Sequence, residues 1–449
     1  MARDAAERYP PQIKFIVASE GAERFSYYGM RSILTVYMAQ YLLLAEHESE
    51  ANYHLFVTAC YLTPLVGGWL ADRFLGRYRV ILWLSLGYVA GHAVIAGWEG
   101  RTGLYAGLAL IAAGSGAIKP CVSAFVGDQF QPSQSRMVER VYGLFYWMIN
   151  LGSFVSSLLV PELLDRYGPR VAFAVPGILM ALALLVFWAG RRHYRVAPPS
   201  GPDPSSFTRV VATALGRLGR RPPGGHWLDA ARERHPPEAV EGAKAVVRVT
   251  AVFAAITGFW ALFDQHGSSW VLQARQMDLR LGGYTLQPSQ LSALNPVMVL
   301  GLIPLFHGGL YPWLERRGVR VTPLRRIGAG MFVTTLSFVA AAVLQILIDL
   351  GGRPHALWQV IPYLILTVGE VLVSVTGLEF AYTQAPRNMK STIMSFWFLT
   401  IAAGNLLTAW VSQLNRFQGA GYFAFFAALV FVSALAFAAV ARSYRPASP

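Results

Sequence analysis

The sequence predicts an all-α protein that crosses a membrane about twelve times, because its composition and the lengths of its apolar segments both suit a bilayer. Of its 449 residues, 54% are apolar and only 14% are charged, whereas soluble domains have about 25% charged residues. The mean hydropathy is +0.41. The apolar segments reach the length of about 20 residues that a helix needs to cross the hydrocarbon core. A soluble fold of this length would need far more polar surface.

The expected helices form two sets of six, separated by one long polar connection. The N-terminal set occupies residues 1–193, the connection residues 194–244 and the C-terminal set residues 245–449. Two helical bundles joined in this way are typical of transporters whose halves rock against each other around a central site. The expected spans are 14–43, 53–74, 78–98, 103–126, 142–163, 170–192, 246–275, 290–314, 323–350, 356–385, 389–415 and 419–442.

Arginine residues indicate how the expected helices are oriented. They cluster after the second and eighth spans, whereas the loop after the first span is acidic; Arg275 and Arg280 go against this trend. By the positive-inside rule, we expect both termini in the cytoplasm. As a separate expectation, the membrane is the plasma (inner) membrane. The clustered residues are Arg73, Arg77 and Arg79 after the second span and Arg316, Arg317, Arg320, Arg325 and Arg326 after the eighth.

The polar connection contains one segment with helical periodicity. Apolar residues recur at helical spacing from Phe207 to Leu218, and Arg209 and Arg217 lie among them. This pattern predicts a short amphipathic helix at the cytoplasmic interface. A disordered linker is the alternative.

Several classes of function find no support in the sequence. The net charge is +14, but the arginines lie in short runs between apolar segments, so we expect no nucleic-acid partner. Cys60 and Cys121 both lie inside apolar segments and indicate neither a disulfide framework nor a metal site. A nucleophile with its base, a His-Glu-x-x-His cluster and a nucleotide-binding glycine loop are all missing. We therefore expect neither an enzyme nor an ATP-driven pump.

The first expected span carries ionisable residues inside an apolar helix. At 3.6 residues per turn, Glu20, Arg24 and Arg31 fall along one face. Glu23 lies at the edge of that face. In a soluble protein such residues would form an ordinary surface ion pair. A charge at mid-depth in a bilayer costs at least about 2.5 to 3.5 kcal/mol, so these residues are expected to face the bundle interior or a watery cavity.

The loop after the second span, from Gly67 to Arg79, resembles the loop motif of the major facilitator superfamily, in the form found in its proton-dependent oligopeptide transporters. Small residues there let helices approach closely, and Asp72 among arginines can form a charge latch. The resemblance covers nearly the whole chain. The other matching stretches are Glu20-Gly-Ala-Glu23-Arg24, Ile118-Lys119-Pro120-Cys121, Phe145-Tyr146-Trp-Met-Ile-Asn150-Leu-Gly152-Ser153, Phe263-Asp264-Gln265, Gly369-Glu370 and Gly377-Leu-Glu379-Phe.

This resemblance implies a fold and a function. The fold would be the major facilitator fold, with two six-helix bundles. The function would be proton-coupled symport that imports di- and tripeptides by alternating access, performed by a monomer with protons as the coupling ion and no other cofactor. Plant relatives carry nitrate, so the same scaffold with nitrate or a peptide-like small molecule is the alternative. The retained Glu-x-x-Glu-Arg motif and Glu370 favour peptides.

The resemblance also implies which residues bind substrate. Arg24 and Lys119 would face the peptide carboxylate, and Glu370 would face its ammonium group, so that both charged ends are held whatever the side chains. Asparagine amides would suit the peptide backbone, and aromatic rings would tolerate many side chains. Lys119 could instead snorkel to a helix end, the asparagines could bridge helices, and the aromatic residues could simply pack. The remaining expected binding residues are Tyr27, Tyr28, Tyr61, Asn150, Asn295 and Trp397.

For proton coupling, the resemblance pairs Arg31 with Asp264 as an outer gate and Lys119 with Glu370 as an inner gate. Protonation of Asp264 would remove one charge of its pair and weaken the closed outer gate. Glu20 and Glu23, close together beside Arg24, are other proton candidates. His54, at the start of the second span, is a further candidate, because it resembles a histidine of animal members of the family and imidazole titrates near physiological pH. His54 could instead be an ordinary interfacial residue.

Overall fold

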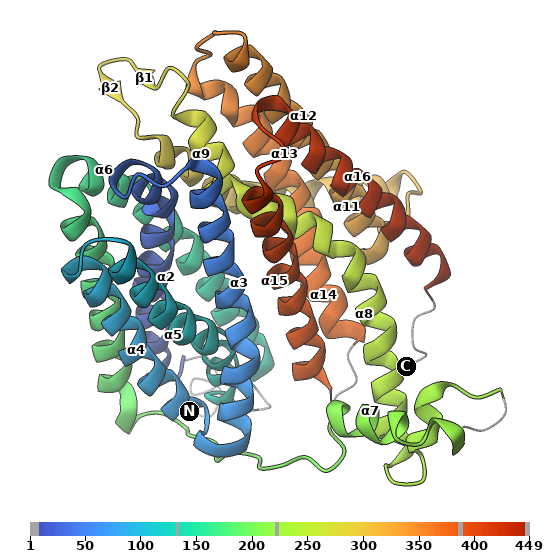
Figure 1. Ribbon diagram of the computed structural model, residues 1–449. Coiled ribbons are helices and arrows are strands. Elements are labelled where there is room, and N and C mark those ends of the chain that lie inside the picture. The colour runs from blue at the N-terminus through green and yellow to red at the C-terminus, as the bar shows by residue number, and fades with distance from the viewer. Residues whose placement is uncertain (1–8, 132–133, 221–223, 385–388, 445–449) are drawn as a thin grey trace.

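The computed structural model describes residues 9–131, 134–220, 224–384 and 389–444 (Figure 1). This part of the chain is almost entirely helical, and its named strands are the two of one short hairpin, β1 (Arg280–Leu281) and β2 (Tyr284–Thr285). The prediction of an all-α polytopic protein is therefore confirmed. The extreme residues of both expected bundles, 1–8 and 445–449, lie outside the described residues.

Ten helical stretches of the described chain are long and apolar enough to cross a membrane. One of them, Arg140–Arg192, contains two helices that meet at Gly168, whose φ of +77° is accessible to glycine at little steric cost. Helix α2 (Ile13–Val36) is a further helix of sufficient length, although it is not among the ten. Helix α2 is less apolar than the ten because it contains several charged residues. Counted in this way, the described residues form twelve membrane-length helices, as the sequence predicts.

The first six helices share one apolar core. Within it, α2 packs closely against α6, because a Cβ atom at Gly152 would lie 3.0 Å from the carbonyl oxygen of Gly21. This close approach holds the charged face of α2 beside α6. The other helices of this bundle are α3 (Glu46–Leu70), α4 (Arg77–Gly97), α5 (Arg101–Asp128) and α6 (Ser135–Ala189), the last of which includes both helices that meet at Gly168.

The second bundle has its own apolar core and contains three interrupted helices. Short 3₁₀ or π-helical turns at Asp264–Gly267, Phe306–Leu310 and Val371–Val375 divide them. Such turns commonly mark functional sites in helices. The interrupted helices consist of α8 (Pro237–Phe263) with α9 (Ser269–Ala274), α10 (Leu294–Leu305) with α11 (Tyr311–Arg316), and α13 (Val360–Glu370) with α14 (Thr376–Gln384). The uninterrupted helices of this bundle are α12 (Pro323–Asp349), α15 (Lys390–Leu414) and α16 (Gly419–Ser443).

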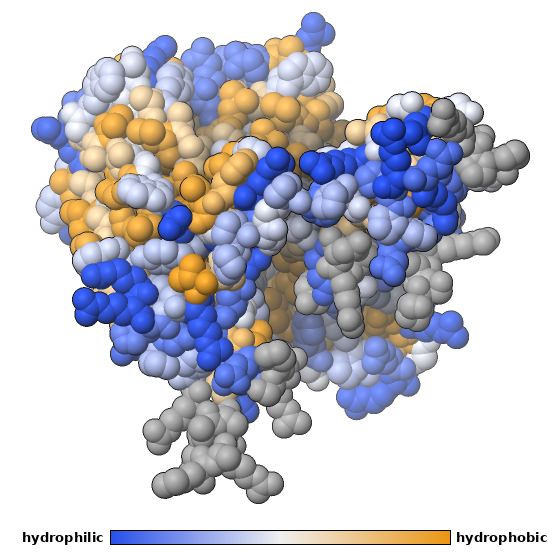
Figure 2. Space-filling model, turned by 90° about the horizontal axis from the view of Figure 1, so that it is seen from below, coloured by the Kyte–Doolittle hydropathy of each residue, from blue (hydrophilic) through white to orange (hydrophobic). Residues whose placement is uncertain are grey.

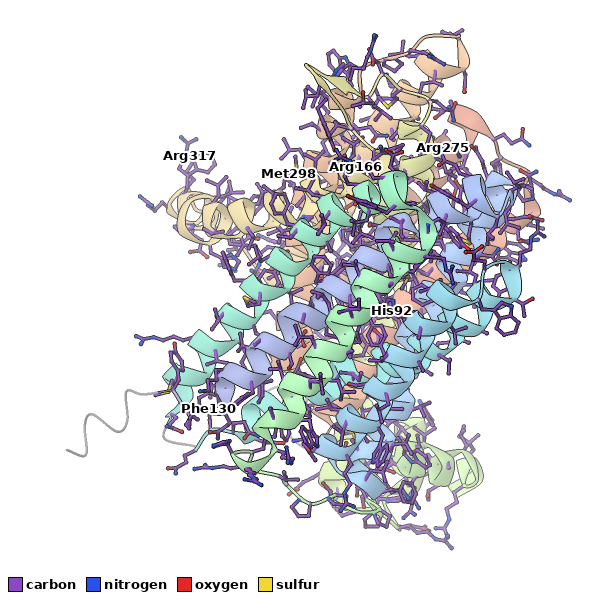
Figure 3. The ribbon with its side chains drawn as sticks, turned by 90° about the vertical axis from the view of Figure 1, so that its left-hand side faces the viewer. His92, Phe130, Arg166, Arg275, Met298 and Arg317 are labelled. Atoms are coloured by element: carbon purple, nitrogen blue, oxygen red, sulfur yellow. The ribbon has the colours of Figure 1, made fainter. Side chains whose placement is uncertain are left out.

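The molecule has two distinct ends, which we call the hairpin end, where β1 and β2 lie, and the linker end, where α7 (Phe207–Leu215) lies (Figure 1). Arg166 and Arg275 lie at the hairpin end and Phe130 at the opposite end (Figure 3). Viewed from the linker end, hydrophilic residues occupy much of the rim, and hydrophobic residues are visible deeper between the two halves (Figure 2).

The connection between the bundles begins as an extended stretch and then folds against α8. Residues 193–206 contain no helix, and the amide of Gly201 donates a hydrogen bond to the carbonyl of Asp72 at 3.2 Å. Val210 and Ala214 of α7 are then buried in the core of the second bundle. Partial burial disfavours the charge of Asp229, but hydrogen bonds from Lys244 and Arg232 outweigh this effect. They lower the pKa of the Asp229 carboxyl to about 2, so this contact stays ionic at neutral pH.

Candidate functional site

A cavity of about 150 Å³ lies between the two bundles. Helices α2, α3 and α6 line it on one side, and the turn after α8 together with α10 and α13 lines it on the other. Convergent polar side chains in such a cavity are the usual mark of a ligand site. Seven of the residues singled out in the sequence line this cavity, namely Tyr28, Arg31, Tyr61, Asn150, Asp264, Asn295 and Glu370.

The strongest contact across the cavity joins Arg31 of α2 to Asp264 at the end of α8. The guanidinium Nη2 donates a short hydrogen bond to Asp264 Oδ1, and Nε donates to the hydroxyl of Tyr53 at 2.6 Å. Asp264 Oδ2 accepts from the amide of Asn405 at 2.7 Å. Arg31 is 7% exposed and Asp264 is 2% exposed. Removing either partner would leave a buried, uncompensated charge, which is strongly destabilising.

His54 extends this network along α3. It is fully buried, its Nδ1 lies 2.8 Å from Asn405 Oδ1, and its Nε2 lies 2.8 Å from the hydroxyl of Ser268. Asn405 thus contacts His54 and Asp264 at once. This position rules out an exposed interfacial residue, and His54 belongs to the contact between the bundles.

The charged face of α2 continues below Arg31 with a group of three residues. Arg24 Nε lies 2.9 Å from Glu20 Oε1 and 2.5 Å from Glu23 Oε2, and all three side chains are buried. Among the described residues, both carboxylate oxygens of Glu23 and the Nε of Arg24 make no aligned hydrogen bond. The group therefore has unused hydrogen-bonding capacity, which an incoming ligand, water or proton could satisfy.

Lys119 of α5 lies near this group without a polar partner. Its ammonium lies 4.0 Å from the ring centre of Tyr27 and 4.7 Å from that of Tyr61. Within the described part of the chain it makes no hydrogen bond. Cation–π contacts of this kind hold the ammonium in place. Its N–H groups remain free for an anionic ligand.

Glu370 lies at the end of α13, on the opposite bundle. Its Oε2 accepts a hydrogen bond from the amide of Asn295 at 2.6 Å, and the same amide donates to Thr367 Oγ1 at 3.2 Å. Glu370 forms no ion pair with Lys119 in the described structure, although the sequence suggests that pair as an inner gate. The Arg31–Asp264 pair is therefore closed, while Lys119 and Glu370 are not paired.

Two of the expected binding residues have other surroundings. Asn150 lines the cavity, but its amide donates to the carbonyl of Tyr146 in its own helix, at 2.9 Å. Trp397 is buried in the core of the second bundle, where it packs on Phe253 and Trp260. Trp397 is not among the residues that line the cavity, and neither are three other expected binding residues, Arg24, Tyr27 and Lys119.

The structure adds residues that the sequence analysis did not select. Tyr53 and Asn405 bond directly to the Arg31–Asp264 pair, and Tyr146 and His266 line the cavity. An isolated asparagine within an apolar helix is a signal that could have identified Asn405, because polar residues in membrane helices usually have a specific partner. Tyr146 lies within a quoted motif and Tyr53 directly precedes His54, but aromatic residues are too common in such helices to stand out.

Polar contacts between the bundles are concentrated near the hairpin end. Besides the network around Arg31, the hydroxyl of Tyr284 donates to Glu162 at 2.7 Å, and Arg275 lies 3.4 Å from Glu46. Thr35 and Gln290 donate to backbone carbonyls across the same interface, at 2.9 Å each. In the linker half, the ion pairs of the described residues stay within one bundle, as for Arg77 with Asp128. The bundles are thus joined at the hairpin end.

Comparison with known proteins identifies similar sequences. The sequence profile of the POT family matches residues 78–420. Solute carrier family 15 member 2 of Mus musculus is 40% identical over 391 residues, which cover 82% of this chain and 54% of the mouse protein. Peptide transporter 3 of Caenorhabditis elegans is 41% identical over 366 residues, which cover 76% of this chain and 51% of the worm protein. The chain thus spans about half the length of the curated relatives it matches.

Solved structures with the same fold are also similar in sequence. A crystal structure of the POT family transporter PepTSo superposes with a TM-score of 0.90 at 41% identity, covering 97% of this chain and 99% of that one. A mutant of peptide transporter POT, crystallised in complex with alafosfalin, superposes with a TM-score of 0.82 at 28% identity, covering 97% and 95%.

Replacing Asn405 with alanine should loosen the closure at the hairpin end, because Asp264 and His54 both lose a partner there. A hydrogen bond to a charged group contributes about 1.5–3 kcal/mol, so the open population at this end should rise at least tenfold. Spin labels at positions 99 and 353 would show the change as a longer distance component. Asn150→Ala is the matched control, because that amide bonds within its own helix. Equal distance distributions for both variants would contradict the assignment.

Proposed function

This chain belongs to the POT family, and we propose that it is a proton-coupled symporter that imports di- and tripeptides by alternating access. The observation that carries the proposal is the presence of opposite charges on the two bundles that flank one cavity. Glu370 lines the cavity from the second bundle. Arg24 and Lys119 of the first bundle have unused donors, and Lys119 lies 4.7 Å from the ring centre of Tyr61, which lines the cavity. A zwitterionic peptide carries complementary charges at its two ends. Nitrate has no cationic end for Glu370, so the geometry favours peptides over the anion alternative.

In this proposal the two termini of the peptide are held and its side chains are not. Arg24 and Lys119 bind the carboxylate, with Tyr28 beside them, and Glu370 binds the ammonium group. An extended peptide lengthens by about 3.3–3.6 Å per residue, so clamps at a given separation restrict the length of the substrate. Asn295 holds Glu370 and presents its own amide, and the remaining lining is aromatic or polar. That remaining lining includes Tyr61 and Asn150, whereas Tyr27 contacts Lys119 and Trp397 packs in the core of the second bundle.

Proton coupling in this proposal acts on the Arg31–Asp264 pair. A proton on Asp264 removes one charge, weakens the contact between the bundles and permits opening at the hairpin end. Substrate and proton would then enter together from the hairpin end. Closure of that end, with opening of the linker end, would release both toward the linker end. His54, Glu20 and Glu23 are the other groups that could carry the proton. His54 is buried near the Arg31–Asp264 pair, and the two glutamates are buried against Arg24.

The proposed orientation follows from the charge pattern. The linker end faces the cytoplasm, and the hairpin end faces outward across the plasma (inner) membrane. The contacts between the bundles then describe an inward-facing state, closed outside and with the inner pair separated. We propose a monomer that needs no cofactor beyond the coupling proton, and a transporter rather than an enzyme.

Uptake of labelled dialanine into proteoliposomes tests the proposal. With the interior alkaline, the peptide should accumulate, because inward proton flow is coupled to its entry. Accumulation should disappear when the gradient is collapsed, and unlabelled dipeptides should compete. Uptake that is indifferent to the gradient, or to competing peptides, would refute proton-coupled peptide transport.

Asp264→Asn should abolish accumulation driven by the gradient and leave peptide exchange partly intact, because the variant carries no proton at this position yet keeps the substrate clamps. Asp128→Asn is the matched control, since it removes an ion pair within one bundle. Both variants would be measured for accumulation and for exchange in the same liposomes. If Asp264→Asn accumulates peptide fully, the proton is carried by Glu20, Glu23 or His54 instead.

Glu370→Gln should weaken the transport of free-amine peptides more than that of N-acetylated peptides. Loss of one charge-assisted hydrogen bond, about 1.5–3 kcal/mol, corresponds to a ten- to hundredfold fall in apparent affinity for the free amine. Competition assays with dialanine and N-acetyl-dialanine would measure the difference. Glu379→Gln serves as the control, because Glu379 pairs with Arg326 at 3.0 Å and does not line the cavity. An equal loss for both peptides would place the ammonium elsewhere.

A further inference from the structure

A second cavity, of about 300 Å³, lies toward the hairpin end and shares no lining residue with the central one. Helix α3 of the first bundle lines one side, and α9, α12, α15 and α16 of the second bundle line the others. Its volume is at the lower limit of small-ligand sites, roughly 300–1,000 Å³. A molecule bound there would touch both bundles at the end where they are joined.

Glu50 of α3 is the most unusual group in this second cavity. It is 9% exposed, and its Oε2 accepts a hydrogen bond from the Ser412 hydroxyl at 3.3 Å. Glu46, one turn earlier, lies 3.4 Å from Arg275. Glu50 itself forms no ion pair with any described residue. A buried carboxylate that has long hydroxyl contacts and no cation is poorly compensated.

The wall opposite Glu50 is polar and already held in place. Gln273 donates to Gln345 at 3.0 Å, and Gln345 in turn donates to Asp349 at 2.9 Å. Phe417 and Tyr422 add aromatic rings to the lining. Apart from one histidine, the residues that line this cavity in the described chain include no basic side chain. The lining therefore offers acceptors and aromatic rings, but almost no positive charge.

We propose that this second cavity binds a small organic ammonium compound from the hairpin end. The ammonium group would pair with Glu50, and the apolar body would lie against the aromatic rings, which favour nearby cations. The described residues contain no group of three or more metal-ligating side chains that could hold a metal ion, so an organic cation fits better than a metal ion.

Such a ligand would act as an effector rather than as a substrate. It would contact α3 on one bundle and α15 and α16 on the other, and this set of contacts exists only while the hairpin end is closed. A ligand shifts a conformational equilibrium toward the state that it binds better. Occupancy would therefore hold the transporter closed at that end. This consequence depends on the proposed transport function, whereas the binding itself does not.

Binding of 4-fluorophenethylamine to the full chain in lipid nanodiscs tests the proposal, with fluorine NMR line broadening as the readout. The wild type and Glu99→Gln, which removes an exposed carboxylate outside this cavity, should bind equally. Glu50→Gln should bind at least tenfold more weakly, as should the neutral analogue 2-(4-fluorophenyl)ethanol with the wild type. Phe417→Leu, a change at a side chain that is 41% exposed, should weaken binding about threefold without affecting folding.

Glu370→Gln separates this site from the central cavity and should leave amine binding unchanged. Binding that is unaffected by both Glu50→Gln and Phe417→Leu would overturn the proposal, as would binding lost in Glu370→Gln. In proteoliposomes, the amine should inhibit dialanine uptake, and excess dialanine should not relieve the inhibition. Amine binding without any effect on uptake would overturn the effector role, whereas gradient-independent uptake without the amine would count against the transport function alone.

Discussion

The buried pair of Arg31 and Asp264 is the interaction on which the rest of the structure depends. Each charge is tolerable at this depth only because the other neutralises it and because Tyr53 and Asn405 take the remaining hydrogen-bonding positions. The two charges come from different bundles, so their pairing fixes how the bundles contact each other at this end. Asn405 of α15 also contacts His54 of α3, so four helices, α2, α3, α8 and α15, meet around the pair. Closure at the hairpin end is thus one connected network.

The position of this network explains the contrast between the two halves of the interface. Near the hairpin end the polar groups are matched across the bundles. Toward the linker end, Lys119 and Glu23 keep hydrogen-bonding capacity that no described neighbour uses. Because two rigid bundles cannot meet closely at both ends at once, satisfying one set of groups exposes the other. In the proposed function, a ligand with two charged ends would supply some of the missing partners.

Much of this arrangement could be predicted from the sequence. Segment length predicts the twelve helices, and helical periodicity places Glu20, Arg24 and Arg31 on one face of α2. The family resemblance pairs Arg31 with Asp264, more than 200 residues away, which periodicity alone could not do. Periodicity identifies a face of a helix but not the neighbour that this face contacts. The burial of Trp397 in the second core and the contact between Asn405 and His54 therefore follow only from the packing of helices. Likewise, the second cavity depends on five helices and has no local signature.

The extended stretch at residues 193–206 determines how the two halves are tethered. Fourteen residues of open chain reach about 45–50 Å when fully drawn out, because each residue spans roughly 3.3–3.6 Å. Much of this stretch is attached to the first bundle: the side chain of Gln129 bonds to the backbone of Arg195, the Tyr194 hydroxyl donates to Phe187, and the Gly201 amide donates to Asp72. While these contacts last, the connection permits less separation of the linker ends than its full length would. In the proposed rocking motion, the contacts at the hairpin end would act as the pivot.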